Sequence, residues 1–324
     1  MKKISDYAAE AEMAIRDLNL KDKEPASLYA PIDYALSSGG KRLRPGLLMM
    51  TAESFGGEKA LDQAKLPAVG IEMFHNFTLL HDDVMDNSEM RRGRPSVFKQ
   101  WDSNTAILSG DTMLTLAVQL ISNVPDATLR EVLSIFNAMA LEVYEGQRLD
   151  MDFEKMENIN SDTYIEMIRK KTGALLGAAC AIGALIGGAS QKDASLLATF
   201  GNMLGIAFQI QDDWLDTYGD SSTFGKPIGG DILNDKKTFL YVKAFEADKA
   251  DTEALKVVMK ELKGDAKIKA VTKIYDKIGL NETTRQAVSY YSKQAVKALK
   301  ATSLSDEAKE PFRLLVEKLT GRKK

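Results

Sequence analysis

Apolar residues return along this chain at intervals of three and four positions, the spacing that gathers them on one face of an α-helix. The pattern is clearest in residues 47–55, 106–121, 128–149, 165–186 and 195–215. The sequence shows no strand-like alternation of useful length and no linker-like tract, and its eight prolines stand singly near the ends of periodic stretches. We therefore predict an all-α protein with a single domain spanning residues 1–324.

Two carboxylate clusters with the spacing DDxxD lie within this helical sequence: Asp82, Asp83 and Asp86, and then Asp212, Asp213 and Asp216. The first and last members of a cluster are four residues apart, so they project from one helix face one turn apart. Two like charges 4 Å apart repel by about 1 kcal/mol in water and about 4 kcal/mol at an effective dielectric near 20. Carboxylates without a sulfur or imidazole partner predict a hard cation, Mg²⁺ or Mn²⁺.

The helix of the first cluster has one chemical face. His75, Asp82 and Asp86 fall within about 40° of one another at 100° per residue. The chain has two histidines, and the second, His81, lies about 120° from His75, so the two do not form a shared metal pair and we assign His81 no ligand role.

The later helix repeats this arrangement, because Gln209, Asp212 and Asp216 share a face and Asp213 lies about 100° to one side. A single DDxxD is most simply a solvated helix surface. Two copies embedded in apolar sequence favour a metal site built from helices that face each other across a cavity.

Basic residues accompany both clusters, and each basic turn taken singly is compatible with simple solvation. Lys41, Arg42 and Arg44 follow the glycines of Gly39-Gly40, and Arg91, Arg92 and Arg94 follow the first cluster. Further basic residues lie later in the chain: Lys170, Lys171, Lys226, Lys236 and Lys237. A diphosphate carries roughly three charges, and guanidinium groups suit its oxygen atoms. Since Mg²⁺ commonly bridges carboxylates and phosphates, the two sets of residues together predict a diphosphate substrate.

Composition excludes several other functions. The net charge of −3 gives no general affinity for nucleic acid or anionic lipid. A single cysteine, Cys180, excludes an internal disulfide and fits a reducing compartment. The first residues are not typical of a signal peptide, and residues 173–189, the least polar stretch, are too short and too rich in glycine for a membrane span. We expect a cytoplasmic protein in which small residues allow helices to approach closely.

With these residues assembled, the chain resembles the trans-isoprenyl diphosphate synthases, the short-chain polyprenyl synthetases that make geranyl, farnesyl and geranylgeranyl diphosphate. The resemblance covers about residues 28–240, and the last 80 residues match only in being helical. Its motifs are GGKRLRP (39–45), LLHDDVMDNSEMRRGRP (79–95), GD (110–111), GQxxD (146–150), KT (171–172), FQIQDDWLD (208–216) and GKPIGGDILNDKKT (225–238). Many members have glycine at the position of Asp235, which leaves the local turn geometry open.

This resemblance implies an isoprenoid synthase-type bundle of long helices around a central active-site cavity, and a homodimer. It implies three Mg²⁺ ions per active site, with Mn²⁺ as a substitute, and assigns roles to individual residues. The direct ligands would be Asp82, Asp86 and Asp212, supported by Asp83, Asp213 and Asp216. The allylic diphosphate would contact Arg91, Lys171, Lys226 and Lys236. Isopentenyl diphosphate would bind Lys41, Arg44, His75 and Arg92. The reacting allylic group would pass Thr172, Gln209 and Lys236.

The expected reaction is a head-to-tail condensation in which the allylic diphosphate leaves and the double bond of isopentenyl diphosphate attacks the resulting cation. Product length should depend on Phe77, which stands about 7.5 Å before Asp82 along the helix axis. Thr78 beside it is small, and Met73 lies one turn further down. One aromatic residue at this place resembles archaeal geranylgeranyl synthases and predicts a twenty-carbon product. Farnesyl diphosphate is the alternative product, and Phe77 as a plain core residue is the alternative interpretation.

Two rival functions are distinguishable. A terpene cyclase shares the first aspartate motif but has no use for a second diphosphate site, which Lys41, Arg44 and Arg92 predict here. A non-catalytic partner subunit would typically lack aspartates from one motif, whereas all six are present. We therefore expect an active prenyltransferase.

Overall fold

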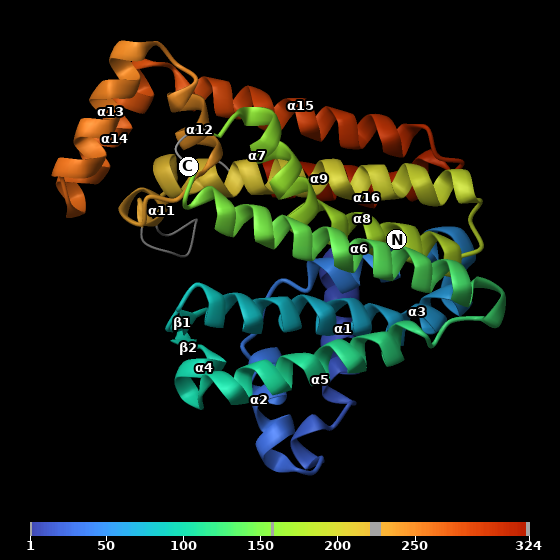
Figure 1. Ribbon diagram of the computed structural model, residues 1–324. Coiled ribbons are helices and arrows are strands. Elements are labelled where there is room, and N and C mark those ends of the chain that lie inside the picture. Colours follow the sequence, from blue (N-terminus) through green and yellow to red (C-terminus); the bar gives the residue numbers. More distant parts are fainter. Residues whose placement is uncertain (1, 157–158, 221–227, 322–324) are drawn as a thin grey trace. The chain divides into compact units, whose positions relative to one another are not determined.

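The computed structural model describes residues 2–156, 159–220 and 228–321. Within these ranges nearly all regular structure is helical, so the predicted all-α class is confirmed (Figure 1). The chain forms two compact units. The first unit comprises Met1–Ala138, Ala178–Ala198 and Thr302–Pro311, and the second comprises Met139–Gly177, Thr199–Ala301 and Phe312–Lys324. That these units make a single domain stays a prediction.

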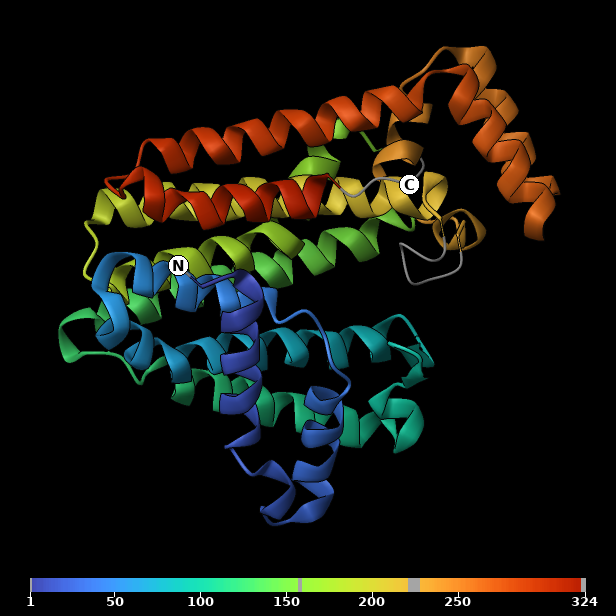
Figure 2. The same cartoon turned by 180° about the vertical axis from the view of Figure 1, so that it is seen from behind.

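The first unit begins with α1 (Ile4–Arg16), η1 (Leu20–Asp22) and α2 (Ala26–Ser37). Next come α3 (Leu43–Met85), the hairpin strands β1 (Met90–Arg91) and β2 (Arg94–Pro95), α4 (Val97–Gln100) and α5 (Ser103–Ile121). The long helices α3 and α5 run side by side (Figures 1 and 2). Helical geometry in α3 is interrupted at Gly57, where φ is 66°.

Close packing in the first unit depends on small residues of α8 (Ala174–Ile186). A Cβ atom at Gly183 would stand 2.3 Å from the carbonyl oxygen of Leu48, so only glycine permits this approach. Cys180 beside it is fully buried, and burial raises the pKa of its thiol to about 12. The expectation that the small residues of this stretch serve helix packing is confirmed. No helix of the described ranges is long and apolar enough to cross a membrane.

The second unit contains much of α6 (Asp126–Phe153), α7 (Ser161–Ile168), η2 (Arg169–Gly173) and most of α9 (Gln191–Tyr218). It continues with α11 (Gly230–Leu233), α12 (Phe239–Phe245), α13 (Lys249–Glu261), α14 (Gly264–Lys277), α15 (Leu280–Lys300) and the end of α16 (Asp306–Thr320). In both views α13 and α14 lie side by side (Figures 1 and 2). An apolar cluster that includes Ile206, Ile210 and Phe239 forms its core.

One predicted element differs from the structure. The apolar spacing of residues 165–186 predicts one continuous α-helix, but η2 divides it with a π-helical turn. Residues 169–173 contain no large apolar side chain, and Ile168 and Leu175 on either side are seven residues apart, a spacing that also fits an uninterrupted α-helix. Periodicity alone therefore does not reveal the π-turn.

Candidate active site

The first aspartate cluster lies at the carboxyl end of α3, in the first unit. Asp83 is 3% exposed, whereas Asp82 is partly exposed and Asp86, the C-cap residue, is exposed. The structure therefore separates two outward carboxylates one turn apart from one inward carboxylate, as the helical period predicts. A helix C-terminus carries partial negative charge, which disfavours further anions there by about 0.3–1 kcal/mol each. A cation relieves this repulsion.

The inward carboxylate is held by the hairpin that follows α3. Arg91 donates from Nε to Asp83 Oδ1 at 2.8 Å and from Nη2 to the same oxygen at 2.5 Å. Burial raises the pKa of Asp83, and Arg91 opposes that rise. Asp83 thus fixes the position of Arg91, one of the residues predicted to contact the allylic diphosphate.

Arg44, at the beginning of α3, meets His75, which lies beyond the break at Gly57 and about two turns before Asp82. Arg44 Nη1 lies 3.2 Å from His75 Nε2. Desolvation, followed by the charges of Arg44 and Arg92, lowers the pKa of His75 well below 6.5, so the ring is neutral and accepts a hydrogen bond from Arg44. Arg44 Nε is buried and has no hydrogen-bond partner among the described residues, and an anion satisfies a donor of this kind.

Another cation, Arg92 of the turn between β1 and β2, packs against the glycine turn before α3. Arg92 donates a hydrogen bond to the carbonyl oxygen of Gly39. Gly40 has φ of 139°, and a Cβ atom there would stand 3.0 Å from Arg92 Nη1. The second glycine therefore makes room for a guanidinium, in addition to the backbone approach to phosphate that the sequence predicts. Lys41 beside it is exposed.

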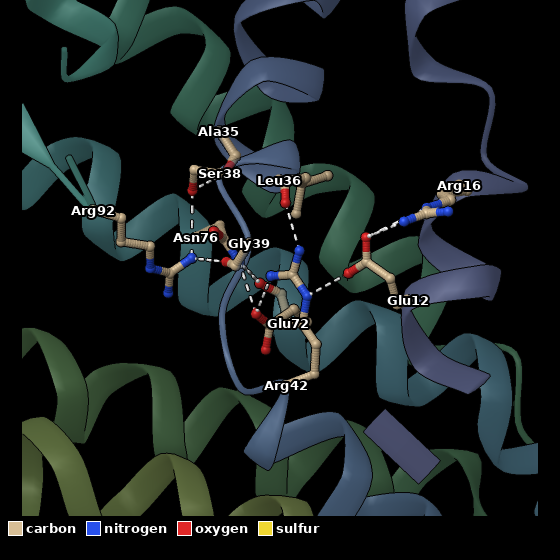
Figure 3. A network of polar contacts seen from close by, with 10 residues as sticks. All are labelled: Glu12, Arg16, Ala35, Leu36, Ser38, Gly39, Arg42, Glu72, Asn76 and Arg92. Carbon is tan, nitrogen blue, oxygen red and sulfur yellow. Dashed lines mark hydrogen bonds and ion pairs between the residues drawn. The ribbon is translucent and has the colours of Figure 1, made fainter. Parts of the chain in front are cut away.

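Arg42, the middle cation of GGKRLRP, turns away from this cluster and into the protein (Figure 3). Its Nη1 donates to Glu72 Oε1 at 2.8 Å, its Nε donates to Glu12 Oε2 at 2.8 Å, and its Nη2 donates to the carbonyl oxygen of Leu36. Arg42 has φ of 44°, in the left-handed region, so the network stabilises a strained turn. The motif groups Arg42 with Lys41 and Arg44, and sequence reasoning missed the role of Arg42 and Glu72 in positioning the turn.

The second aspartate cluster lies near the end of α9, in the second unit. Asp213 is 2% exposed and accepts hydrogen bonds from the hydroxyl group of Tyr164, from Gln209 Nε2 and from the backbone N–H of Phe239. Asp216 is 5% exposed and accepts from the backbone N–H of Asp231 at 3.0 Å. These two carboxylates are committed to protein donors, which agrees with supporting roles.

Asp212 differs from its neighbours because it is partly exposed. Burial and the charge of Asp231 raise the pKa of Asp213 to about 7 and that of Asp216 to about 6. The protein groups around these two carboxylates therefore do not fully stabilise their negative charge, and a bound cation would stabilise the ionised forms of Asp213 and Asp216. Asp231 belongs to the last of the family motifs, but sequence reasoning assigned it no role.

The turn after α11 carries Lys236. Its Nζ lies 3.8 Å from Asp231 Oδ1; burial lowers its pKa, but attraction to Asp231 and other aspartates produces a net rise. The preceding Asp235 has φ of 53°, a left-handed conformation that glycine adopts freely and aspartate tolerates. Its Oδ1 accepts from Lys267 Nζ at 2.7 Å, and this bond holds the side chain of Asp235 at the turn.

The π-turn η2 presents Lys171 and Thr172. Lys171 Nζ lies 2.6 Å from Asp150 Oδ2, and the Thr172 hydroxyl donates to Gln209 Oε1 at 3.3 Å. Thr172 and Gln209 are therefore brought together, as predicted. A Cβ atom at Gly146 would stand 2.4 Å from the backbone nitrogen of Lys171, so the glycine of GQxxD lets α6 approach the π-turn. Such turns recur at functional sites.

The residues predicted to set chain length lie on α3. Phe77 is 6% exposed and its ring centroid lies 5.5 Å from that of Phe74 and 4.8 Å from that of His81. Met73 is fully buried, and the Thr78 hydroxyl donates to the carbonyl oxygen of His75. His81 lies 3.1 Å from the carbonyl oxygen of Ile107, in agreement with its having no assigned ligand role. Lys226 lies outside the described residues.

Magnesium fits the donors present. Among the described residues no three histidine, cysteine, aspartate or glutamate side chains converge into a ready-made metal site. Mg²⁺ does not need one, because it usually keeps several waters and binds one or two carboxylates together with substrate phosphates. Asp82, Asp86 and Asp212 are the cluster members that reach solvent and suit this mode.

Comparison with known proteins gives a consistent result. A family model described as polyprenyl synthetase matches residues 25–278. The chain is 35% identical over 314 residues to a short chain isoprenyl diphosphate synthase of Methanothermobacter thermautotrophicus, covering 96% of this chain and 95% of that one. It is 38% identical over 306 residues to a geranylgeranyl diphosphate synthase of Sulfolobus acidocaldarius, covering 92% and 91%.

Solved structures agree with these sequences. The crystal structure of a geranylgeranyl pyrophosphate synthase matches with a TM-score of 0.93 and 38% identity, covering 100% of both chains. The similarity therefore extends beyond residues 28–240, and the last 80 residues share more than helical character with the proteins matched.

Proposed function

Because the chain belongs to the polyprenyl synthetase family, we propose that it condenses isopentenyl diphosphate with dimethylallyl, geranyl and farnesyl diphosphate to give geranylgeranyl diphosphate. The protein is a prenyltransferase with the all-α isoprenoid synthase fold, as its sequence predicts. The twenty-carbon product, the metal and the roles of individual residues are parts of the proposal.

Two groups of opposite charge support this reaction most directly. Arg44, from the beginning of α3, and neutral His75, from beyond the break at Gly57, form a cationic cluster with an unsatisfied donor, and Asp82 and Asp86 follow His75 by about 10 and 16 Å along the axis. Cations alone suit a bare diphosphate, whereas outward carboxylates suit a diphosphate bridged by metal. One helix thus offers binding groups for two diphosphates, which a condensation needs and a cyclase does not.

In the proposed reaction Asp82, Asp86 and Asp212 would hold Mg²⁺, with Asp83, Asp213 and Asp216 supporting them. Bound there, Mg²⁺ would supply the positive charge that makes the allylic diphosphate a better leaving group. The cations Arg91, Lys171, Lys226 and Lys236 stabilise the negative charge that develops as the C–O bond breaks. Arg91 retains Nη1 for this purpose, because Asp83 occupies its Nε and Nη2.

Other side chains orient the second substrate and the reacting carbon atoms. Lys41, Arg44, His75 and Arg92 bind the diphosphate of isopentenyl diphosphate. Thr172 donates to Gln209, and Gln209 donates to Asp213. These bonds fix the orientation of the Thr172 hydroxyl oxygen and the Gln209 amide oxygen beside the developing allylic cation. The proton lost after attack by the double bond passes to the departed diphosphate, which requires no side-chain base.

Substitution of the outward carboxylates tests the metal assignment. Asp82→Ala and Asp212→Ala should each lower turnover by a factor of about 10² or more, because charge stabilisation of the leaving group is lost. Asp62→Ala is the matched control, since Asp62 is an exposed aspartate on α3 that pairs with Lys65 at the surface. Near-normal turnover in either cluster variant, with Mg²⁺ present, would overturn the assignment.

We also propose a homodimer. Helix α5 displays exposed apolar side chains, with Ile107 44%, Leu108 60% and Val118 37% exposed. Exposed apolar side chains grouped on one helix commonly mark an interface. Sedimentation of the purified chain tests this, and a monomer at micromolar concentration would refute it.

A further inference from the structure

One cavity is lined by none of the residues assigned to the reaction. It is in the second unit, has a volume of about 950 Å³, and is lined by the end of α9, by one face of α15 and by the last turn of α16. Pockets for small molecules usually measure about 300–1,000 Å³, so this one is large enough for an organic ligand. We call it the α15 groove.

The floor of the α15 groove is apolar. Trp214 and Val288 are 5% and 4% exposed, and Val296 and Val316 continue the apolar lining. Trp214 Nε1 donates to Asn281 Oδ1 at 3.0 Å, so the polar atom of the indole is satisfied and its ring presents apolar surface. These four side chains offer apolar contacts to a hydrocarbon, and the lining also includes the uncharged polar residues Gln211, Asn281, Ser289, Ser292 and Thr320.

The rim of the groove is cationic. Arg285, Lys293, Lys297 and Lys300 line it from α15, and the lining contains no aspartate or glutamate among the residues described. Arg285, Lys293 and Lys297 have no carboxylate within 4.0 Å in the described structure. By contrast, several lysines elsewhere in this unit are paired, as Lys170 is with Glu145 and Lys267 is with Asp235. Unneutralised cations beside an apolar floor complement a ligand with an anionic head and an apolar chain.

We propose that the α15 groove binds a second molecule of prenyl diphosphate, distinct from the one that reacts. Its diphosphate contacts Arg285, Lys293 and Lys297, and its hydrocarbon chain lies along Trp214 and the valines. Inorganic diphosphate would leave the apolar floor in water, so the chain is part of the recognition. The identity of this ligand as a prenyl diphosphate rests on the proposed function.

The position of the groove on α9 makes the bound molecule a regulator. Gln211 and Trp214 line the groove and flank Asp212 and Asp213 in the sequence. Binding therefore contacts the helical turn that carries the second aspartate cluster. Accumulated product lowers turnover by this route, and a saturating concentration of allylic substrate does not relieve the inhibition.

Calorimetry of the whole protein tests the proposal. Geranylgeranyl diphosphate is titrated in EDTA with isopentenyl diphosphate in saturating excess, so that metal-dependent binding and the Arg44 cluster do not contribute. The variant is Lys293→Gln/Lys297→Gln, which removes two cations four residues apart. Lys269→Gln/Lys273→Gln on α14 is the matched control, because these lysines have the same spacing and no ion-pair partner within the described ranges.

We expect one molecule bound per chain in the wild type and the control, and affinity weaker by about tenfold or more in the groove variant. The groove variant should keep its initial turnover but lose the inhibition by product. Equal affinity in all three proteins, absence of binding in EDTA, or equal binding of inorganic diphosphate would each overturn the proposal.

Elongation of farnesyl diphosphate separates this inference from the proposed function. If the wild type elongates farnesyl diphosphate yet shows one of the contrary binding results, the groove inference fails and the proposed function stands. If the wild type binds geranylgeranyl diphosphate in the groove but elongates none of the allylic primers, the proposed function fails and the groove remains a binding site for prenyl diphosphates.

Discussion

Arg42 and Glu72 form a fully buried ion pair, with 2.8 Å between Nη1 and Oε1 and 2% exposure of each side chain. The pair connects the turn before α3 to the part of that helix beyond the break at Gly57. It thereby holds the turn that leads into Arg44, and Arg92 packs against Gly39 of this turn. Arg42 therefore supports this cluster without facing it.

Breaking this pair should destabilise the protein. Arg42→Met leaves Glu72 buried and unpaired and should cost about 3–5 kcal/mol of unfolding free energy. Arg42→Met/Glu72→Leu should cost much less than the sum of the two single variants. Arg16→Gln is the control, since Arg16 pairs with Glu12 at the surface and exposed pairs contribute about 1 kcal/mol or less. Urea unfolding measures all four, and additive losses would show that the two side chains are not coupled.

His75 should make stability depend on pH. Its folded pKa lies well below the unfolded value near 6.5, so the unfolded state binds more protons as the pH falls through 6.5. The contribution of neutral His75 is therefore fully present above pH 6.5 and is lost below it. His75→Gln should reduce the slope of unfolding free energy between pH 6.5 and 5 by up to about 1.4 kcal/mol per pH unit. Parallel curves for wild type and variant would contradict a neutral, desolvated ring.

Gly146 should be required for the π-turn. Gly146→Ala places a methyl group 2.4 Å from the backbone nitrogen of Lys171, so η2 must shift and carry Lys171 and Thr172 with it. We expect destabilisation by about 1–3 kcal/mol and turnover lower by about tenfold or more. Arg148→Ala, an exposed substitution on the same helix, should change neither quantity appreciably. Steady-state kinetics are measured together with circular dichroism, and unchanged kinetics in Gly146→Ala would show that the turn tolerates the shift.

Phe77 should limit the length of the product. Phe77→Ala removes the aromatic side chain five residues before Asp82, which we expect to block the growing hydrocarbon chain. The variant should therefore make products longer than twenty carbons. Phe136→Ala is the control. Phe136 is a buried aromatic residue that packs on Phe74, a neighbour of Phe77, with 5.3 Å between the ring centroids of Phe136 and Phe74. It should destabilise the protein by about 3–5 kcal/mol without lengthening the product. An unchanged product from Phe77→Ala, by mass spectrometry, would make Phe77 a plain core residue.

The sequence predicts those parts of the site that depend on helical period. His75, Asp82 and Asp86 on one face of α3, and outward Asp82 beside inward Asp83, follow from 3.6 residues per turn. The distinction between Arg42 and Arg44 does not, because it depends on which cation reaches the distant Glu72. The π-turn at residues 169–173 escapes periodicity, since Ile168 and Leu175 on either side of it keep a spacing of seven that also fits a continuous α-helix. The left-handed Asp235 is indicated only by the glycine that other family members have there.

The proposed condensation is tested by a product assay. Purified protein is incubated with Mg²⁺, labelled isopentenyl diphosphate and, in separate reactions, dimethylallyl, geranyl or farnesyl diphosphate, and chain length is read by mass spectrometry. We expect incorporation of label from all three primers and a twenty-carbon diphosphate as the main product. Release of hydrocarbon from farnesyl diphosphate without incorporation of label would contradict the condensation, and accumulation at fifteen carbons would contradict the assigned product length.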